Sequence, residues 1–443
     1  MEILLINPYT KFPGKSPSIP IGLLQLAALP NKNGHNVKIL DCNKSSIEDV
    51  KKQIKKSDPD IIGFTGWTGQ TLKIPIELST FSRENTNSKI VWGGPHPSLL
   101  PRQVIKEDYV DFVIVGEGDL SFNNLIENIK NPEKVKGIFY KEKGKILSTG
   151  KSEICENLDT LPLMPWEIID LKSYVFEWVD GMKSMVLPTS RGCPYNCSFC
   201  YNKSFYQRKW RPYSVKTIEE NLENLLSLSP KIEAVRFDYE DNFLGNDPKR
   251  AIKISELAKK NDLKWGCQLR VNNSERSIIE KFKNNGCEYI FFGIESGSQR
   301  ILDFLRKGIT VGQSVKVFDI CNELKIRAVA GLMLDIPTEK NEDFKKTIKL
   351  AERLNNIVNV GFYQPYPGTD LFDHVVINGF VPPQSTEEWS NFKMSSYHNF
   401  SEVSSAKLKF AYYYLNNVLN PAVLLKKKDY KTFYMLLKTV LKI

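Results

Sequence analysis

Three cysteines, Cys193, Cys197 and Cys200, lie within eight residues of one another with the spacing C-x3-C-x2-C. Thiolates this close in sequence can converge on one centre, and three soft sulfur ligands suit an iron–sulfur cluster. A [4Fe–4S] cluster has four irons, so three cysteines leave one iron without a protein ligand and free to bind a small molecule. The spacing therefore predicts a [4Fe–4S] cluster with one open iron.

Three close cysteines can also form a zinc knuckle or a disulfide cluster. Structural zinc sites have four ligands, commonly in C-x2-C pairs, and no fourth cysteine or histidine lies near this stretch. The remaining five cysteines are scattered singly, mostly in apolar segments. Such a distribution is typical of buried free thiols in a reducing compartment. These observations favour the iron–sulfur cluster.

The composition indicates a soluble globular protein of two or three domains, with 443 residues, 41% hydrophobic and 25% charged. No apolar run is long enough to span a bilayer, and the first residues lack the basic region and cleavage site of a signal peptide. We therefore expect a cytoplasmic protein without an integral membrane segment. The net charge of +10 comes from dispersed lysines. It does not form a basic face interleaved with aromatics, so we expect no nucleic-acid partner.

Short, β-branched apolar runs alternate with helix-like segments over the first 145 residues. This alternation predicts a doubly wound, Rossmann-like parallel sheet, and ligands bind such sheets at the carboxyl ends of the strands. The expected strands are 3–6, 37–40, 61–65, 90–92 and 112–115, and the expected helices are 22–33, 46–57, 72–85 and 120–129.

A second alternation of strands and helices follows the cysteines, in residues 186–375. This alternation predicts a partial barrel of parallel strands, and in such barrels the reacting groups lie at the carboxyl ends of the strands. Residues 146–185, with Pro162 and Pro165 in an irregular stretch, read as a linker, and residues 376–443 as a small, mainly helical C-terminal cap. The expected strands are 185–189, 234–237, 264–270, 289–294, 328–334 and 358–363. The expected helices are 215–228, 248–260, 275–285, 299–306, 311–324 and 341–354.

The cysteine loop, with Phe199 before its last cysteine, resembles the radical S-adenosylmethionine (SAM) signature C-x3-C-x-aromatic-C. In that family the open iron chelates SAM, which is cleaved to a 5′-deoxyadenosyl radical. The upstream loops together resemble the cobalamin-binding domain of class B radical SAM enzymes. The resemblance implies a cobalamin-binding domain (1–145), a linker (146–185), a partial (β/α)6 TIM-type radical SAM barrel (186–375) and a C-terminal cap (376–443). The matching loops are Pro20-Ile21-Gly22-Leu23, residues 59–65, Gly93-Gly94-Pro95-His96-Pro97 and Val115-Gly116-Glu117-Gly118.

The same resemblance implies a SAM site at the carboxyl ends of the barrel strands. Carboxylates there suit the SAM ammonium, and an arginine suits its carboxylate by bidentate pairing. An internal salt bridge of Glu240 or Glu295 with Arg270 or Lys307 is the structural alternative. The residues expected to contact SAM are Phe199, Glu240, Asp241, Arg270, Glu295 and Ser296, and those expected at the barrel mouth, where SAM and substrate meet, are Tyr366, Gly368 and Thr369.

The loop after the fifth barrel strand departs from the family pattern L-G-x-P-G-E. Asp335 and Thr338 replace the two glycines, and non-glycine residues tolerate a positive φ poorly. We therefore expect this loop to have a different shape, which puts its adenine contacts in doubt.

The cobalamin site is expected to lack a protein imidazole ligand. Many cobalamin proteins carry D-x-H-x-x-G after the first strand, but residues 7–12 contain no histidine here. The resemblance therefore implies base-off cobalamin, with His96 hydrogen-bonded to the corrin periphery or the nucleotide tail. Trp67 either covers a corrin face or only packs against neighbouring side chains. The residues expected to contact cobalamin are Thr65, Trp67, Gly93, Gly94, His96, Gly116 and Glu117.

The leading hypothesis is a radical SAM enzyme that methylates an unactivated carbon or phosphorus of a small molecule through a 5′-deoxyadenosyl radical and methylcobalamin. The expected substrate is a specialised metabolite or a lipid or cell-envelope precursor, and the expected electron donor is a flavodoxin or ferredoxin. A cyclase or oxidative rearrangement enzyme of the same architecture is the alternative. A non-catalytic cobalamin or iron–sulfur sensor is a third possibility, and the carboxylates and arginine expected around the cluster argue against it.

Overall fold

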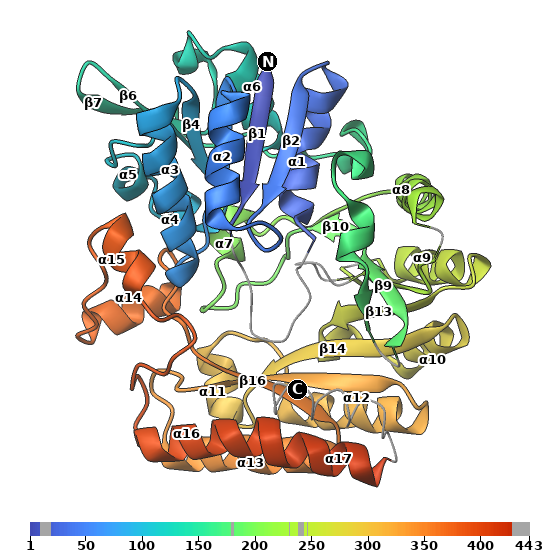
Figure 1. The fold of residues 1–443 in the computed structure, drawn as a ribbon. Coiled ribbons are helices and arrows are strands. Elements are labelled where there is room, and N and C mark those ends of the chain that lie inside the picture. Colours follow the sequence, from blue (N-terminus) through green and yellow to red (C-terminus); the bar gives the residue numbers. More distant parts are fainter. Residues whose placement is uncertain (9–18, 179–180, 230, 238–242, 246, 428–443) are drawn as a thin grey trace.

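The computed structural model describes residues 1–8, 19–178, 181–229, 231–237, 243–245 and 247–427. Two α/β units lie one above the other, with the cysteine-bearing segment between them (Figure 1). In the upper unit the carboxyl ends of strands β1 (Glu2–Asn7) and β2 (Asn36–Asp41) point toward the lower unit. The ligand-binding edge of the first sheet therefore faces the second unit.

The first unit contains a seven-stranded sheet with the order β2-β1-β3-β4-β5-β6-β7. Its first five strands are parallel, whereas β6 and β7 form an antiparallel hairpin on one edge. The structure confirms the predicted doubly wound sheet and adds this hairpin. The remaining strands are β3 (Ile61–Thr65), β4 (Lys89–Gly93), β5 (Phe112–Ile114), β6 (Ile138–Glu142) and β7 (Lys145–Ser148).

Helices cover both faces of this sheet because successive strand residues point to opposite sides. In β1, Leu4 and Ile6 join the core beneath helices α2 and α3, while Ile3 and Leu5 join the core beneath α1 and α6. Both faces are buried, which explains the continuous apolar runs. The helices are α1 (Ile21–Lys32), α2 (Ile47–Ser57), α3 (Lys73–Asn85), α4 (Pro95–Leu99), α5 (Pro101–Val104) and α6 (Asp119–Glu127).

The second unit is an open, curled sheet with the order β16-β15-β14-β13-β12-β9-β8. Its first six strands are parallel and form the expected partial barrel, and β8 (Phe176–Glu177) pairs antiparallel with β9. The parallel strands are β9 (Lys183–Val186), β12 (Ala234–Phe237), β13 (Lys264–Leu269), β14 (Cys287–Glu295), β15 (Arg327–Leu334) and β16 (Ile357–Phe362).

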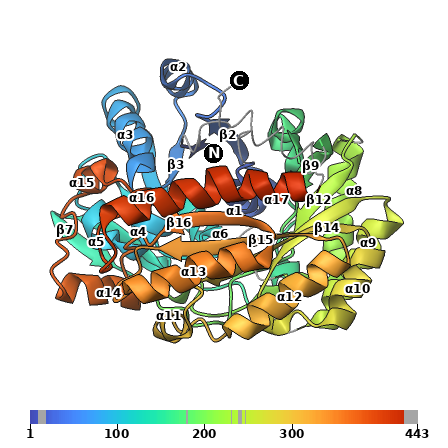
Figure 2. The same ribbon diagram turned by 90° about the horizontal axis from the view of Figure 1, so that it is seen from below.

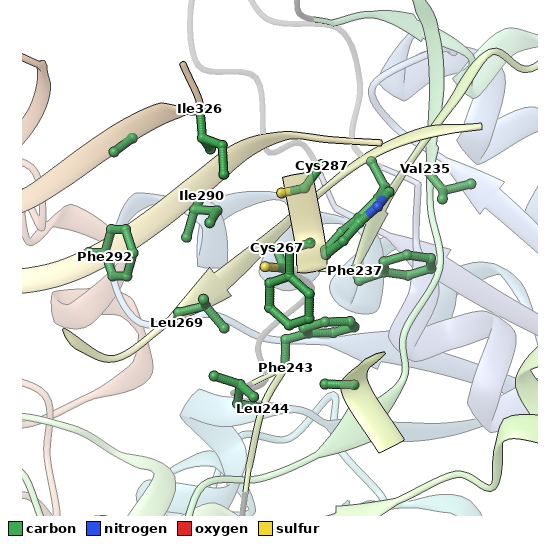
Figure 3. Close-up of a cluster of buried hydrophobic side chains, with 14 of the residues drawn as sticks. Val235, Phe237, Phe243, Leu244, Cys267, Leu269, Cys287, Ile290, Phe292 and Ile326 are labelled. Atoms are coloured by element: carbon green, nitrogen blue, oxygen red, sulfur yellow. The ribbon is translucent and has the colours of Figure 1, made fainter. Parts of the chain in front are cut away.

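Helices α8 to α13 follow the barrel strands, and a continuous apolar core fills the space between sheet and helices. Figure 3 shows part of this core, in which Phe237, Phe243, Cys267 and Cys287 belong to one cluster of buried side chains. The Phe237 and Phe243 rings stack with their centroids 5.5 Å apart. The helices are α8 (Val215–Leu228), α9 (Pro248–Lys260), α10 (Arg276–Asn284), α11 (Gln299–Phe304), α12 (Val311–Glu323) and α13 (Asn341–Leu354).

The segment before the barrel contacts both units. Trp166 is fully buried in the barrel core, and the Met164 amide donates to Asn221 Oδ1 of α8 at 3.1 Å. Further along, the Tyr174 hydroxyl donates to Asp41 Oδ2 at the end of β2, at 2.8 Å. This segment therefore ties the carboxyl edge of the first sheet to the barrel.

The C-terminal segment continues from α14 (Asp370–Ile377) and α15 (Thr386–Asn391) into a long helical rod. The rod consists of α16 (Ser405–Tyr414), a π-helical turn (Leu415–Leu419) and α17 (Asn420–Lys426). It lies beside α13 and across β16, on the side of the sheet turned away from the first unit (Figure 2). Within the described ranges, no helix is both long enough and apolar enough to cross a membrane.

Candidate active site

The cysteine-bearing loop runs between two short paired strands, β10 (Ser190–Arg191) and β11 (Arg211–Pro212). Gly192 starts the loop with φ of +79°, and a Cβ there would collide with the carbonyl oxygen of Lys209. Farther along, the Ser198 amide donates to the Leu305 carbonyl, and the Leu371 amide donates to the Ser198 carbonyl, each at 2.9 Å. These bonds fix the loop to the C-terminal end of α11 and to the first turn of α14.

The three cysteines line one cavity of about 390 Å³ at the carboxyl ends of the barrel strands. Its size lies within the range of about 300–1,000 Å³ that is usual for small-molecule sites. Phe199, Arg270 and Glu295 line the same cavity. The structure therefore brings the three cysteines together with three of the six predicted SAM residues.

Arg270 follows β13 and lies beside the cluster loop. Its Nη1 is 3.7 Å from the Cys197 sulfur, and its guanidinium carbon lies 3.6 Å from the centre of the Tyr195 ring. The Tyr195 hydroxyl is held in turn by Asn273 Nδ2 at 2.8 Å. Stacking and hydrogen bonding thus orient the cation toward the cysteines.

Glu295 ends β14 and forms an ion pair with Lys307, with 2.7 Å between Lys307 Nζ and Glu295 Oε1. Both side chains are nearly buried, and Glu295 has φ of +67°. The pair is the salt bridge that the sequence left open as an alternative. It lines the cluster cavity, so an ion pair and a role toward a ligand are compatible here.

The cavity fits a cluster in its donor set, because all three thiols line it together with Arg270 and Lys307. Burial raises the pKa of the Cys200 thiol to about 12 and also raises that of Cys193, so thiolates there need nearby positive charge, which iron supplies. Within the described ranges, no three histidine, cysteine or carboxylate side chains are arranged to hold a single metal ion. A cluster instead needs each cysteine at a different iron.

Ser296, another predicted SAM residue, does not line this cavity. Ser296 is fully buried, and its hydroxyl shares a hydrogen bond with Thr347 Oγ1 at 3.1 Å. It accepts from the Ser298 amide at the same distance, so it shapes the turn after β14. Glu240 and Asp241 lie outside the described residues.

Asp335 and Thr338 do not avoid a positive φ, which was the reason for expecting their loop to have a different shape. Both take a left-handed backbone, with φ of +59° and +67°. Asp335 tolerates it because its carboxylate accepts hydrogen bonds from the His398 amide at 2.8 Å and from the Ser401 amide and hydroxyl at 3.0 Å each. The aspartate thus replaces glycine and also anchors the C-terminal segment.

Replacing Asp335 with alanine is expected to destabilise the protein by about 2–3 kcal/mol, because buried donors lose a charged acceptor while the strained φ remains. Urea unfolding measures the loss, and hydrogen exchange is expected to show faster exchange at the His398 and Ser401 amides. Asp373→Ala, at an exposed position of α14, is the control and is expected to change stability by less than about 0.5 kcal/mol. Unchanged exchange at both amides would contradict the anchor.

A second cavity lies at the carboxyl edge of the first sheet. Six of the seven predicted cobalamin residues line it: Thr65, Trp67, Gly93, Gly94, Gly116 and Glu117. Phe205 and Tyr206, from the cluster loop, form part of the same wall. The cysteine loop therefore separates the two cavities and contributes to both.

His96 does not join the other predicted cobalamin residues. Its ring is fully buried, with Nδ1 3.2 Å from Thr68 Oγ1 and the ring edge-on to Trp389. Burial lowers its pKa to about 3, so the ring is neutral. The structure gives this histidine a buried position, and His96 is not among the residues that line the cavity.

The second cavity fits cobalamin only in part. Its volume of about 180 Å³ is smaller than a typical enclosed ligand site, so it can enclose a portion of so large a cofactor. Glycine leaves room there, since a Cβ added to Gly93 would meet only Ile114 Cβ, at 4.0 Å. The backbone near Gly93 can therefore approach a ligand closely.

An aromatic cluster lies beside the second cavity, which Trp67 lines. Tyr201 follows Cys200 directly, and its ring lies 6.2 Å from that of Trp67 and 5.9 Å from that of Tyr366. The Gly368 carbonyl accepts from Ser204 Oγ at 2.8 Å. Thr369 is buried as the N-cap of α14 and accepts from the Phe372 amide at 3.1 Å, so only Tyr366 of this set presents a side chain to the aromatic cluster.

Two charged residues that line the second cavity, Asp119 and Arg191, were not predicted from the sequence. Lys307, which the sequence suggested only as a possible salt-bridge partner of Glu295, lines the cluster cavity. Arg191 precedes Gly192 and Cys193, while Asp119 follows the Gly116-Glu117-Gly118 loop. Their closeness to the two motifs was the available signal, but their pairing depends on how the units meet.

Comparisons with known proteins assign a family to each of the two units. Residues 14–126 match the B12 binding domain and residues 187–351 match the radical SAM superfamily. An uncharacterised methyltransferase of Pyrococcus horikoshii is 32% identical over 441 residues, covering 96% of this chain and 94% of the relative. An anaerobic magnesium-protoporphyrin IX monomethyl ester cyclase of Rubrivivax gelatinosus is 26% identical over 75% of this chain, which spans 61% of that enzyme.

A solved structure has the same fold. The radical SAM methyltransferase TsrM from Kitasatospora setae, solved with cobalamin and a [4Fe–4S] cluster bound, superposes with a TM-score of 0.71 at 15% identity, covering 85% of this chain and 75% of that one. The two domain matches and the Pyrococcus relative show the family. The chain is an enzyme of the class B, cobalamin-binding radical SAM family, and its cofactors are a [4Fe–4S] cluster, SAM and cobalamin.

Proposed function

We propose that the enzyme transfers a methyl group from SAM to an unactivated carbon or phosphorus of a small molecule. The observation that carries this proposal is the single loop between β10 and β11, which supplies walls to both cavities. A radical source and a methyl carrier can then act on one substrate held at the aromatic cluster. The Pyrococcus relative, named a methyltransferase, supports the same reading.

The bound cofactors supply the radical chemistry and carry the methyl group. The protein binds and orients the cofactors and the substrate, and it excludes water from the site. Cys193, Cys197 and Cys200 hold the cluster in this proposal. Arg270 pairs with a carboxylate and Glu295 with an ammonium, which together match the amino-acid end of SAM. Phe199, whose ring centre lies 5.8 Å from Lys307 Nζ, closes the apolar side of the cavity.

On the other side of the loop, the glycines near Gly93 and Gly116 admit cobalamin to the edge of the sheet. We propose a base-off form without a protein imidazole, since His96 is buried away from the cavity. Trp67 and Tyr366 meet at Tyr201 and form the proposed substrate wall. The aromatic wall favours a metabolite or lipid precursor with an apolar face, and we propose a flavodoxin or ferredoxin as the electron donor.

SAM with a deuterated methyl group tests the proposal. The reduced, cofactor-loaded enzyme is incubated with this SAM and a metabolite extract of cells that encode the chain, and the expected result is a small molecule carrying the labelled methyl group. The Cys197→Ala variant, which lacks a cluster ligand, is expected to give none. A new product without the label would instead support a cyclase, the reaction named for the Rubrivivax relative.

A further inference from the structure

Two buried arginine–carboxylate pairs join the ends of the cluster loop to the cobalamin unit. At one end Arg191 donates to Asp119, from Nη1 to Oδ2 at 2.7 Å and from Nη2 to Oδ1 at 3.1 Å. At the other end Arg211 donates to both oxygens of Glu117, with 2.8 Å between Nη1 and Oε2. Each pair is bidentate, which is the most directional form of this interaction.

The two pairs form one network. Arg191 and Arg211 face each other across the antiparallel β10–β11 pairing, and Arg191 Nη1 is also 3.6 Å from Glu117 Oε2. All four side chains are less than a tenth exposed. Burial alone would raise the pKa of Asp119, but the adjacent Arg191 outweighs it and keeps the pKa below its usual value. The network is therefore charged and buried, and each arginine is paired with a carboxylate.

The network connects the cobalamin cavity to the loop that carries the three cysteines. Glu117 lies in the loop between β5 and α6 and Asp119 is the first residue of α6, and Glu117, Asp119 and Arg191 all line the cobalamin cavity. Arg191 is two residues before Cys193, and Arg211 closes the loop that carries all three cysteines. A shift of the β5–α6 loop must therefore move both ends of the cluster loop, because buried bidentate pairs do not stretch.

We propose that Asp119 and Arg191, assisted by Glu117 and Arg211, are positioning residues that couple the cobalamin site energetically to the cluster site. Filling one site orders the shared loop and so favours filling the other. By linkage, the cluster must raise cobalamin affinity by the same factor by which cobalamin stabilises the cluster. The proposal requires both cofactors but does not depend on methyl transfer. An experiment can therefore disprove the coupling without disproving the proposed methyl transfer, and the reverse.

Equilibrium dialysis with hydroxocobalamin measures this coupling. The dissociation constant is determined anaerobically for the full-length protein with a reconstituted cluster, and for the Cys193→Ala/Cys197→Ala/Cys200→Ala variant without one. The wild-type ratio of the two constants is expected to be at least about 5-fold, the lower end of typical coupling between sites. A ratio near one in the wild type would overturn the proposal without any further variant.

Asp119→Asn is expected to reduce the ratio to within about twofold of one, because the neutral amide breaks the bidentate pair. Taking the ratio cancels any direct effect of Asp119 on cobalamin. Asp111→Asn is the matched control. It removes the partner of Arg83, 2.7 Å away at the opposite end of β5, and is expected to retain the wild-type ratio. A folded Asp119→Asn protein with the wild-type ratio would overturn the proposal.

Should Asp119→Asn not fold, Arg191→Lys provides the second variant. Lysine keeps the charge but loses the forked geometry, so the expected ratio lies between one and the wild-type value. The electron paramagnetic resonance spectrum of the reduced cluster is also recorded for Arg191→Lys and for the wild type. The signal of the variant is expected to be broader, because its cluster loop is held less rigidly. An unchanged ratio together with an unchanged spectrum would overturn the positioning role.

Discussion

Replacing Cys197 with alanine is expected to remove the iron–sulfur absorbance while leaving cobalamin bound. Cys197 is one of three thiols that line the cluster cavity, and its sulfur lies 3.7 Å from Arg270 Nη1. Without Cys197 the cluster loses a ligand, and the open iron that binds SAM is no longer held in place by an intact cluster. Turnover is expected to fall to the uncatalysed level, a loss of at least about 10⁶-fold.

The control is Cys321→Ala, at a buried cysteine on α12 that lines neither cavity. This variant is expected to keep both cofactor spectra and most of the activity. Visible spectra of the two anaerobically reconstituted proteins give the comparison directly. If the Cys197→Ala protein retained an intact cluster with normal SAM cleavage, the assignment of the three ligands would be wrong.

The second large effect is expected from Lys307→Ala. This change leaves the Glu295 carboxylate nearly buried and without its cation, which destabilises a protein by about 3–5 kcal/mol. SAM binding is also expected to weaken, because Glu295 would be free to change its position in the cavity. Urea unfolding and a SAM-binding titration measure the two consequences separately.

The Glu295→Ala/Lys307→Ala double variant separates charge burial from packing. It removes both charges, so it is expected to recover part of the stability that Lys307→Ala loses. Lys136→Ala is the control for lysine removal, since its pair with Glu153 is largely exposed, and it is expected to cost less than about 1 kcal/mol. A double variant as unstable as Lys307→Ala would show that packing, and not the ion pair, sets the loss.

The regular elements could be predicted well because their signals are local. Helices α8, α9 and α13 begin and end where periodicity places them, and their apolar stripes face the barrel core. The β6–β7 hairpin was not predicted, although Lys143 and Gly144 at its turn both take a positive φ. Its short strands lie at the sheet edge and lack the continuous apolar runs that identify strands buried on both faces.

The candidate site could be predicted only where a motif carries it. The cysteines and the glycine loops lie in contiguous patterns, and the structure gathers them into two cavities. The Asp119–Arg191 pair joins residues from different units, and no local pattern encodes it. His96 shares a motif with Gly93 and Gly94, but the first turn of α4 directs it into the core. The motif predicts which loop lies at the site, but it does not predict which side chains of that loop face the cavity.

The central claim is that one chain holds both a radical source and a methyl carrier. It is tested most directly by incubating the reduced, cobalamin-loaded enzyme with SAM alone and counting two products, S-adenosylhomocysteine and 5′-deoxyadenosine. Methyl transfer to the carrier needs no substrate, so the account predicts one S-adenosylhomocysteine for each bound cobalamin. Formation of 5′-deoxyadenosine with no S-adenosylhomocysteine would contradict it.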